Sequence, residues 1–492
     1  MAWAMPARSN RRADRRIAPC SAISAGPQGR SFVCGSRRHG HFHRMSASPP
    51  LPQRRVLGLI FLTVFMDIIG FSIVIPLFPH LLDYYITTEG AEGTLIGALN
   101  SAAEWMGGDT VFKKTVLFGG LLSTLYSLLQ FVFSPLWGAL SDRIGRRRVL
   151  VLTLAGNALS YLVWIFAAQF WVVVLTRLVC GMMAGNIAVA SAAAADVTDE
   201  KDRTKGMAVV GIAIGLGFVF GPVIGGLASS VQFPDLAHGV SFGLNPFSVP
   251  ALIAASMAIM NFILVVKFFP ETLAPERRAN ADAKRPSVFD LATVRSSAVR
   301  RTSFANLVYQ VAFTGMENTI VFLTFALFVY SPRDNAWLFL FNGACMILAQ
   351  GLARQLVRRL GQRKVIMLGM TIAAVAFFVV ALIPPTRALA GDGAETTFYL
   401  GLGLISFATG LILPSVSALV SLYSDASEQG RNLGILRSAG SLARVIGPVT
   451  AALLYFHFGS HFWVYIGGAL LMLPAIWVVR GLPEPESERL KA

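Results

Sequence analysis

The chain has 492 residues, of which 54% are hydrophobic and only 14% are charged. Soluble chains of this length carry about a quarter charged residues, so the composition excludes an ordinary soluble globular protein and indicates a membrane protein. The net charge is +16, but residues 1–50 alone hold nine Arg against one Asp. Most of the remaining excess lies in short connections between apolar runs, which argues against nucleic-acid binding. The four cysteines are scattered and predict neither disulfides nor a metal site.

The first 50 residues contain no apolar run and are rich in Arg, Ala, Ser, Gly and Pro. This composition predicts a disordered tail. Many arginines and few acids also occur in organelle transit segments; the alternative is that translation starts at Met45 and the first 44 residues are dispensable. His39, His41 and His43 alternate in the tail, but no further ligand accompanies them, so we expect no metal there.

Twelve apolar runs follow, most of them longer than the roughly 18 residues that a membrane-crossing helix needs. An even number of spans places both termini on one side. The connections on that side are rich in Lys and Arg, whereas the longest loop of the other side, 83–114, is acidic. The positive-inside bias therefore predicts cytoplasmic termini and a multi-pass protein of the plasma membrane or a bacterial inner membrane. The predicted spans lie near residues 56–82, 115–139, 149–168, 171–195, 205–230, 248–269, 302–330, 335–355, 365–385, 397–422, 432–456 and 460–480.

A long polar stretch at 270–301 divides these spans into two sets of six. Two short patterns repeat across it: Gly361-Gln-Arg-Lys-Val echoes Gly145-Arg-Arg-Arg-Val at an offset of 216, and Gly447-Pro echoes Gly221-Pro at 226. Paired halves with a site between them are typical of secondary transporters. The predicted organisation is a tail (1–50), an N-terminal six-helix half (51–269), a cytoplasmic linker (270–301), a C-terminal six-helix half (302–480) and a tail (481–492).

Charged side chains inside the spans are the first candidates for function, because a charge in lipid is costly and seldom kept without a role. Asp67 lies about 18 Å along the first span and Arg177 about 9 Å below the outer surface, so we expect them to pair. Glu317 and Arg444 occupy similar places in the second half, and Arg437 lies seven residues before Arg444 on one helical face. We predict a proton or substrate relay of Asp67, Arg177, Glu317 and Arg444. The alternatives are a static ion pair or an Arg177 side chain that extends to the outer interface, and, for Glu317, an acid that faces the outer surface.

The fifth predicted span carries Gly217, Gly221, Pro222, Gly225 and Gly226. Glycine at every fourth position forms a smooth face for close helix packing, and proline removes one backbone hydrogen bond and favours a bend. Ordinary close packing is the alternative to a functional bend.

These motifs together resemble the major facilitator superfamily over about residues 54 to 480. The loop Gly138-x-x-x-Asp142-Arg143-x-Gly145-Arg146-Arg147 is similar to the signature loop of that family. Leu175-Thr-Arg177-Leu-Val-Cys-Gly181 resembles its fourth-helix motif, and the glycine-proline run resembles the fifth-helix motif of its drug:proton antiporters. Asp67-x-x-Gly70 followed by Pro76 and Pro79 resembles the first helix of tetracycline efflux proteins, and loop 83–114 resembles that of eukaryotic tetracycline-transporter-like members.

The resemblance implies an all-α major facilitator fold with twelve transmembrane helices. It also implies a conformational latch formed by Gly138, Asp142, Arg143, Gly145, Arg146 and Arg147, in which Asp142 lies against the N-terminus of the eleventh helix and holds the halves together. The second copy departs from the pattern, since Arg358 stands at the position of Asp142 and Arg354 at that of Gly138. The latch is therefore expected in the first copy only. Cys180 stands where many members have Gln.

We predict a proton-coupled antiporter that exports lipophilic or amphiphilic small molecules, as in tetracycline-like drug efflux, by alternating access. Helices 1, 4, 7 and 10 are expected to line its cavity, and the partners are protons, a small-molecule substrate and the lipid bilayer. No cofactor or nucleic acid is expected, and the chain is expected to be a monomer. The first alternative is an organic-anion or metabolite carrier of the same superfamily, which Arg437 and Arg444 would favour. A membrane enzyme or a non-transporting receptor is the second, but no GxxxxGK[ST] or HExxH motif occurs.

Overall fold

The computed structural model describes residues 53–89, 93–106, 110–198, 203–231, 243–273, 294, 296–385, 393–424 and 429–484, except for the side chains of 111–112, 203–205, 208 and 429–431. The predicted tail 1–50 with its three histidines, most of the linker 270–301 and the end of the C-terminal tail lie outside these residues. The described residues form one compact unit. The described part is helical and contains no strand, which confirms the all-α fold that the family resemblance implied.

In the described part, twelve helical segments are long and apolar enough to cross a membrane, and each overlaps one of the predicted spans. The first six segments are built from α1 (Gln53–Ser72), η1 (Ile75–Leu77), α2 (Phe78–Thr88), α4 (Val111–Ile144), α5 (Arg146–Ile165), α6 (Phe170–Met183), α7 (Asn186–Asp196), α8 (Arg203–Ala228) and α9 (Ser248–Phe268). The other six are α11 (Ser297–Phe328), α12 (Pro332–Leu360), α13 (Gln362–Ala381), α14 (Ala394–Leu422), α15 (Gln429–Phe458) and α16 (Phe462–Arg480).

The structure differs from the sequence prediction in the segment 83–114, which was expected to be a loop. It contains a further helix, α3 (Leu95–Trp105). Thr94 caps this helix by accepting a hydrogen bond from the backbone N–H of Gly97 at 3.1 Å, and Ile96 and Ala103 are buried on its inner face. The segment therefore forms a capped helix with one apolar face, although its acidic composition predicted a loop.

The two repeated hinges share one backbone geometry. Gly145 joins α4 to α5 with φ +107°, and Gly361 joins α12 to α13 with φ +81°. Residues with a Cβ seldom adopt this region, so glycine is needed at both turns. Arg147 and Arg363 follow the two glycines at the same distance, and each donates to a backbone carbonyl, of Val266 at 2.5 Å and of Leu482 at 2.6 Å respectively. Val266 and Leu482 are themselves 216 residues apart, so the repeat extends to contacts far along the chain.

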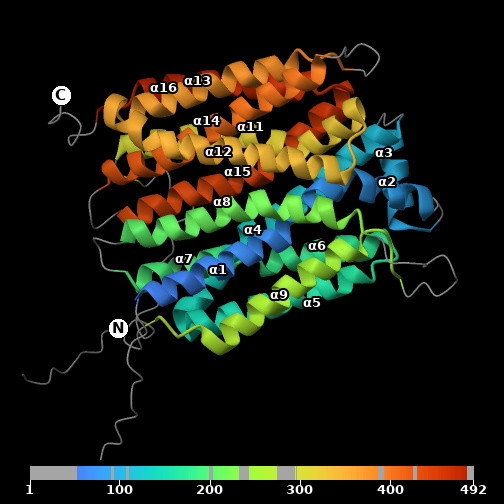
Figure 1. Cartoon of the computed structure of the whole chain (residues 1–492), viewed down its shortest axis with the longest axis horizontal. Coiled ribbons are helices and arrows are strands. Elements are labelled where there is room, and N and C mark those ends of the chain that lie inside the picture. Colours follow the sequence, from blue (N-terminus) through green and yellow to red (C-terminus); the bar gives the residue numbers. More distant parts are fainter. Residues whose placement is uncertain are drawn as a thin grey trace, which may run out of the picture. The chain divides into compact units, whose positions relative to one another are not determined.

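Two seams of packed helices join the first six spans to the last six. In Figure 1, α8 and α4 lie next to α15 and α12, with the blue-to-green helices on one side and the orange-to-red helices on the other. The helix pairs in closest contact across this boundary are α4 with α15 and α8 with α12. Since α4 corresponds to α12 and α8 to α15 in the repeat, the two seams are equivalent.

Both seams are tight at the end of the bundle away from the start of α1. A Cβ on Gly120 of α4 would lie 2.2 Å from the Cβ of Ala452 on α15, and one on Gly226 of α8 would lie 2.1 Å from the backbone oxygen of Pro332 on α12. Such backbone approach requires glycine. His80 Nε2 adds a cross-seam contact of 3.1 Å to the backbone oxygen of Tyr330. The helices are therefore closed against one another at this end.

Candidate functional site

Arg146 is the centre of the charged cluster at the first hinge. Its Nε donates to Asp196 at 2.9 Å, while its Nη1 donates to Ser141 at 2.7 Å and lies 2.5 Å from Asp142. Its backbone N–H donates to Glu271 at 2.9 Å, next to the turn at Gly145. Arg146 is buried, so these partners replace its hydration. The cluster ties the ends of α4, α7 and α9 to the start of α5.

The remaining predicted latch residues lie around this centre. Gly138 is buried and accepts a hydrogen bond from the hydroxyl of Ser141 at 2.7 Å. Arg143 lies in the last turn of α4, where its charge interacts favourably with the helix dipole. Because α4 and α15 are antiparallel and Gly120 faces Ala452, the same register continued down the seam puts Asp142 near the start of α15. The role of these residues as a latch between halves stays a prediction.

The glycine run of the fifth span lies on α8 and packs mainly against α1. A Cβ on Gly217 would lie 2.6 Å from Ile68, and one on Gly221 would lie 3.0 Å from the backbone oxygen of Ile69. A Cβ on Gly225 would lie 2.0 Å from the backbone oxygen of Ile73, just after the end of α1. Gly226 turns to the other side, toward α12, and Pro222 lies inside the helix without interrupting it.

The Gly-Pro repeat preserves a hydroxyl contact in each half. Ser72 Oγ donates to the backbone oxygen of Gly217 at 3.1 Å, four residues before Gly221. Thr314 Oγ1 donates to the backbone oxygen of Ala443 at 3.1 Å, four residues before Gly447. The first contact joins α1 to α8 and the second joins α11 to α15, so both halves lock the same pair of helices in the same way.

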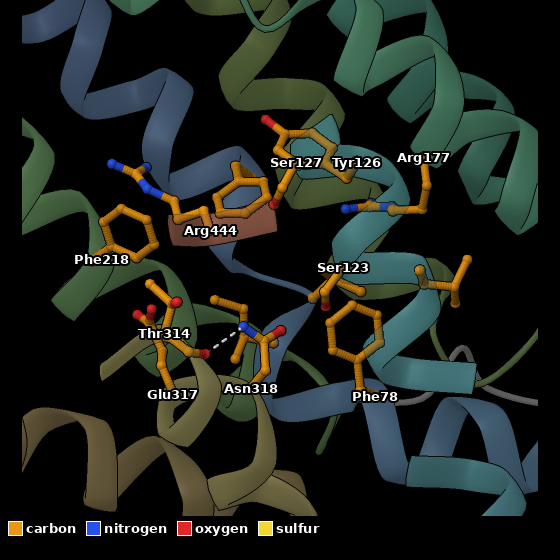
Figure 2. Close-up of a pocket in the computed structure, with 14 residues that line it drawn as sticks. Phe78, Ser123, Tyr126, Ser127, Arg177, Phe218, Thr314, Glu317, Asn318 and Arg444 are labelled. Atoms are coloured by element: carbon orange, nitrogen blue, oxygen red, sulfur yellow. Dashed lines mark hydrogen bonds between the residues drawn. The ribbon is translucent and has the colours of Figure 1, made fainter. Parts of the chain in front are cut away.

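A central cavity of about 40 Å³ lies between the two sets of helices. Its polar lining comes from α4, α6, α11 and α15 and includes Tyr126, Arg177, Glu317, Asn318 and Arg444 (Figure 2). A smaller pocket of about 10 Å³ lies behind it, shares Arg444 with it and reaches Asp67. The prediction that helices 1, 4, 7 and 10 line the cavity is therefore only partly correct. The second, fifth and eleventh spans also contribute, and no residue of the tenth span belongs to the described lining.

Asp67 does not form the predicted ion pair with Arg177. Its Oδ1 instead accepts hydrogen bonds from Asn157 Nδ2 at 3.0 Å and Asn186 Nδ2 at 2.9 Å. Asn186 is the first residue of α7, where the fourth span is interrupted, and it also accepts from Thr153. Two neutral amide donors hold the carboxylate at the edge of the cavity, and among the described residues no cationic side chain forms an ion pair with it.

Arg177 has a different neighbour from the one expected. It is only 2% exposed, and its guanidinium lies 4.9 Å from the ring centre of Trp164. Its Nε and Nη2 have no hydrogen-bond partner in the described part of the chain. In Figure 2 the guanidinium points toward the middle of the cavity, between Tyr126 and Ser123. A buried cation with two unused donors is costly, so Arg177 is a candidate contact for an anionic group.

Glu317 and Arg444 lie on α11 and α15 and line the same cavity. Their charges attract each other across it, but no ion pair within 4.0 Å joins them in the described structure. Asn318, the neighbour of Glu317, donates instead to the backbone oxygen of Thr314 at 3.0 Å (Figure 2). Glu317 and Arg444 thus line the same cavity, as their predicted pairing required, but they do not form a salt bridge in the described structure.

Sequence reasoning missed Asn157, Asn186, Tyr126 and Trp164. Each lies in an apolar run, and the two asparagines were the available signal, because an amide inside a membrane span needs a partner. The described residues contain no group of three or more His, Cys, Asp and Glu placed to hold a metal ion. The site is therefore a set of amide, aromatic and ionic groups around a small cavity between two repeated helix sets.

This arrangement defines a multi-pass integral membrane protein with the architecture of a secondary transporter. The sequence model of the Major Facilitator Superfamily matches residues 60–386 and 305–492. The chain belongs to this superfamily, and it is a transporter, not an enzyme.

Two curated relatives and one solved structure place the chain within the superfamily. It is 33% identical to the bovine (Bos taurus) Major facilitator superfamily domain-containing protein 10 over 466 residues, covering 90% of this chain and 95% of that protein. It is 27% identical to the class E tetracycline resistance protein of Escherichia coli over 442 residues, covering 87% and 95% of the two chains. The crystal structure of the human organic anion transporter MFSD10 (TETRAN) matches with TM-score 0.68 and 29% identity, covering 87% of this chain and all of that one. The tetracycline-like resemblance seen in the motifs is thus real but more distant than the resemblance to protein 10.

Proposed function

We propose that the chain is a proton-coupled transporter of amphiphilic organic anions that works by alternating access between its two six-helix halves. The observation that carries this proposal is Arg177, a buried guanidinium with unused donors that points into the central cavity. The 29% identical human structure described as an organic anion transporter supports the same substrate class. Charged-group hydrogen bonds of this kind are worth about 1.5 to 3 kcal/mol each, enough to select an anion over a neutral analogue.

The charges around the cavity connect anion binding to protons. Arg177 and Arg444 supply two positive charges, and Asp67 and Glu317 supply two negative charges when ionised. An anion added to this balanced set favours protonation of one of the acids, and protonation of an acid favours the anion in return. Anion affinity should therefore rise as pH falls, by up to about tenfold per pH unit for one linked proton.

Movement of the halves is required by the size of the cavity. About 40 Å³ holds a water molecule but no drug-sized solute, for which pockets of about 300 to 1,000 Å³ are usual. Both seams must therefore open in turn. The hinge cluster around Arg146 and Asp142 lies at the end of α4, which supports the proposal that it controls one of them. Cytoplasmic termini, a plasma or bacterial inner membrane and a monomeric state belong to the same proposal.

Export of tetracycline-like drugs by proton antiport is the second candidate. It is favoured by the 27% identical class E tetracycline resistance protein and by the run from Asp67 to Pro79. Its linkage has the opposite sign: a cationic drug competes with protons for the acids, so drug affinity should rise with pH.

Measuring how affinity changes with pH decides between the anion transporter and the tetracycline exporter. The purified full chain in proteoliposomes would be tested with dansylglycine, an aromatic carboxylate, and with tetracycline, each between pH 5.5 and 8. We expect dansylglycine to bind more tightly at low pH than at high pH and to enter faster under an inward proton gradient. Asp67→Asn should remove this pH dependence. Anion affinity that increases with pH, or the absence of anion binding across the range, would refute the proposal; pH-driven tetracycline flux alone would establish the second candidate.

A further inference from the structure

A second and much larger cavity lies beside the central one, where α8 faces α12, α14 and α15. Its volume is about 730 Å³, within the range of drug-sized binding pockets. We call it the lateral chamber. Most of its walls are aliphatic, with two glycines, Gly211 and Gly215, on α8 and four uncharged polar side chains, Gln350, Gln362, Ser417 and Ser421.

Arg437 gives this chamber its chemistry. It is the single charged side chain among the described residues of the lining. Its Nη1 donates to the hydroxyl of Ser191 on α7 at 2.8 Å, which fixes the guanidinium across the gap between the two halves. No carboxylate lies within 4.0 Å of it in the described part of the chain. Arg437 is exposed and lines the chamber, so a solute inside the chamber can reach its guanidinium.

The wall of the lateral chamber includes aliphatic side chains that helix packing leaves uncovered. Ile212, Ile347 and Leu422 line it and are 53%, 49% and 44% exposed. Ile212 and Ile347 lie within segments that are long and apolar enough to cross a membrane, and Leu422 is the last residue of such a segment. The chamber therefore offers uncovered aliphatic surface to the apolar body of a solute.

Shared lining residues connect the lateral chamber to the central cavity. Val219 and Met346 line both the chamber and an intermediate pocket of about 80 Å³. Phe218 and Glu317 line both that pocket and the central cavity. The three spaces thus form a series at successive positions between the halves, with Arg437 at one end and Arg444 at the other. On α15 these two arginines are seven residues apart, about 10 Å along the helix, on one face.

We propose that the lateral chamber is a loading site at which Arg437 holds the anionic group of an amphiphilic solute while its apolar body occupies the aliphatic walls. The solute then passes between Val219 and Met346 toward Arg444. This inference rests on the proposed anion transport for its direction, but the binding site itself is defined by Arg437 and the chamber. A solute without a long apolar chain covers little of the aliphatic walls and should not need the chamber.

Two fluorescent carboxylates with the same dansyl group separate the chamber from the central cavity. Dansylaminoundecanoic acid carries a long apolar chain, whereas dansylglycine carries none. The full chain would be reconstituted in phosphatidylcholine nanodiscs and titrated with each. We expect Arg437→Gln to weaken binding of the long-chain probe by about tenfold or more, as loss of a charge-assisted hydrogen bond implies, and to leave dansylglycine binding unchanged. Arg437→Lys should retain part of the affinity because it keeps the charge.

Glycine variants provide a test that does not alter charge. A Cβ on Gly211 would meet nothing within 4 Å, so Gly211→Trp can fill the chamber without disturbing the backbone. Gly58 on α1 is equally open, is exposed and lies outside the chamber, so Gly58→Trp is the matched control. We expect Gly211→Trp to lower long-chain affinity about tenfold and Gly58→Trp to bind like the wild type. Melting temperatures of all variants show whether each one is folded.

The outcomes distinguish this inference from the proposed function. Long-chain binding that depends on Arg437 and Gly211 supports the lateral chamber even if no proton-linked flux is found. Equal long-chain affinity in the wild type, Arg437→Gln and Gly211→Trp overturns the chamber even if anion transport is confirmed. Occupation by a bilayer lipid would also overturn it: phosphatidylglycerol in the nanodiscs would then abolish probe binding, and native mass spectrometry would find that lipid on the wild type but not on Arg437→Gln.

Discussion

Replacement of Arg177 by methionine should raise stability and lower anion affinity at the same time. A buried charge costs several kcal/mol in the protein interior, and in the ligand-free protein Arg177 recovers about 2 kcal/mol from its stacking on Trp164. Methionine fills a similar volume without the charge, so we expect a net gain of about 2 kcal/mol in the free energy of unfolding. Loss of the hydrogen bonds to a bound anion should cost about 1.5 to 3 kcal/mol, or roughly 10- to 150-fold in affinity.

Thermal unfolding of the purified protein with and without dansylglycine measures both effects. Arg177→Met should melt above the wild type without ligand and show little further increase when the anion is added. Arg177→Lys keeps the charge but loses the planar fork, so it serves as the control and should give a smaller change in both quantities. A lower melting temperature together with unchanged anion affinity would show that Arg177 is a structural residue and does not bind the anion.

Three further predictions concern the turn at Gly145, the buried imidazole of His461 and the carboxylate of Asp142. Gly145→Ala should destabilise the protein by at least about 1 to 2 kcal/mol, because φ is +107° and the new Cβ would lie 2.1 Å from Glu271; chemical denaturation measures this. Burial lowers the pKa of His461 from 6.5 to about 4, so the unfolded chain binds the proton more readily: stability should be complete above pH 6.5 and fall by up to about 3 kcal/mol as pH drops toward 4, a loss that His461→Gln should abolish. Asp142→Asn should reduce transport strongly while Arg358→Gln, at the equivalent exposed position, should transport like the wild type; equal rates in the two variants would contradict the one-sided latch.

The twelve spans could be predicted from sequence because a membrane helix satisfies its own backbone hydrogen bonds, so the apolar run alone defines it. The repeat was readable for the same kind of reason: Gly145 and Gly361 occupy turns that only glycine makes easily, and such positions leave a sequence signature. Segment 95–105 was misjudged because its helix depends on the Thr94 cap and on burial of one face, and neither stands out in a polar stretch.

The charged residues of the site were found, but their partners were not. Asp67 and Arg177 were expected to pair because their depths agree, and depth along a helix says nothing about which way a side chain turns. The structure gives Asp67 two amide donors and places Arg177 over an indole ring. Sequence identifies an expensive group in a membrane; the neighbours that compensate for it depend on the rotation of each helix, which only the packed structure supplies.

The offset of 216 residues gives the architecture its functional meaning. It relates Gly145 to Gly361 and the carbonyl of Val266 to that of Leu482. The two seams are equivalent under the same repeat, yet they differ in content, because the lateral chamber with Arg437 lies along α8 and α12 and no cavity of comparable volume lies along α4 and α15 among the described cavities. A duplicated scaffold needs such asymmetry to bind one solute from one side. We infer that the duplicated scaffold provides the movement. We infer also that Arg177 and Arg437, which the repeat does not copy, bind the substrate.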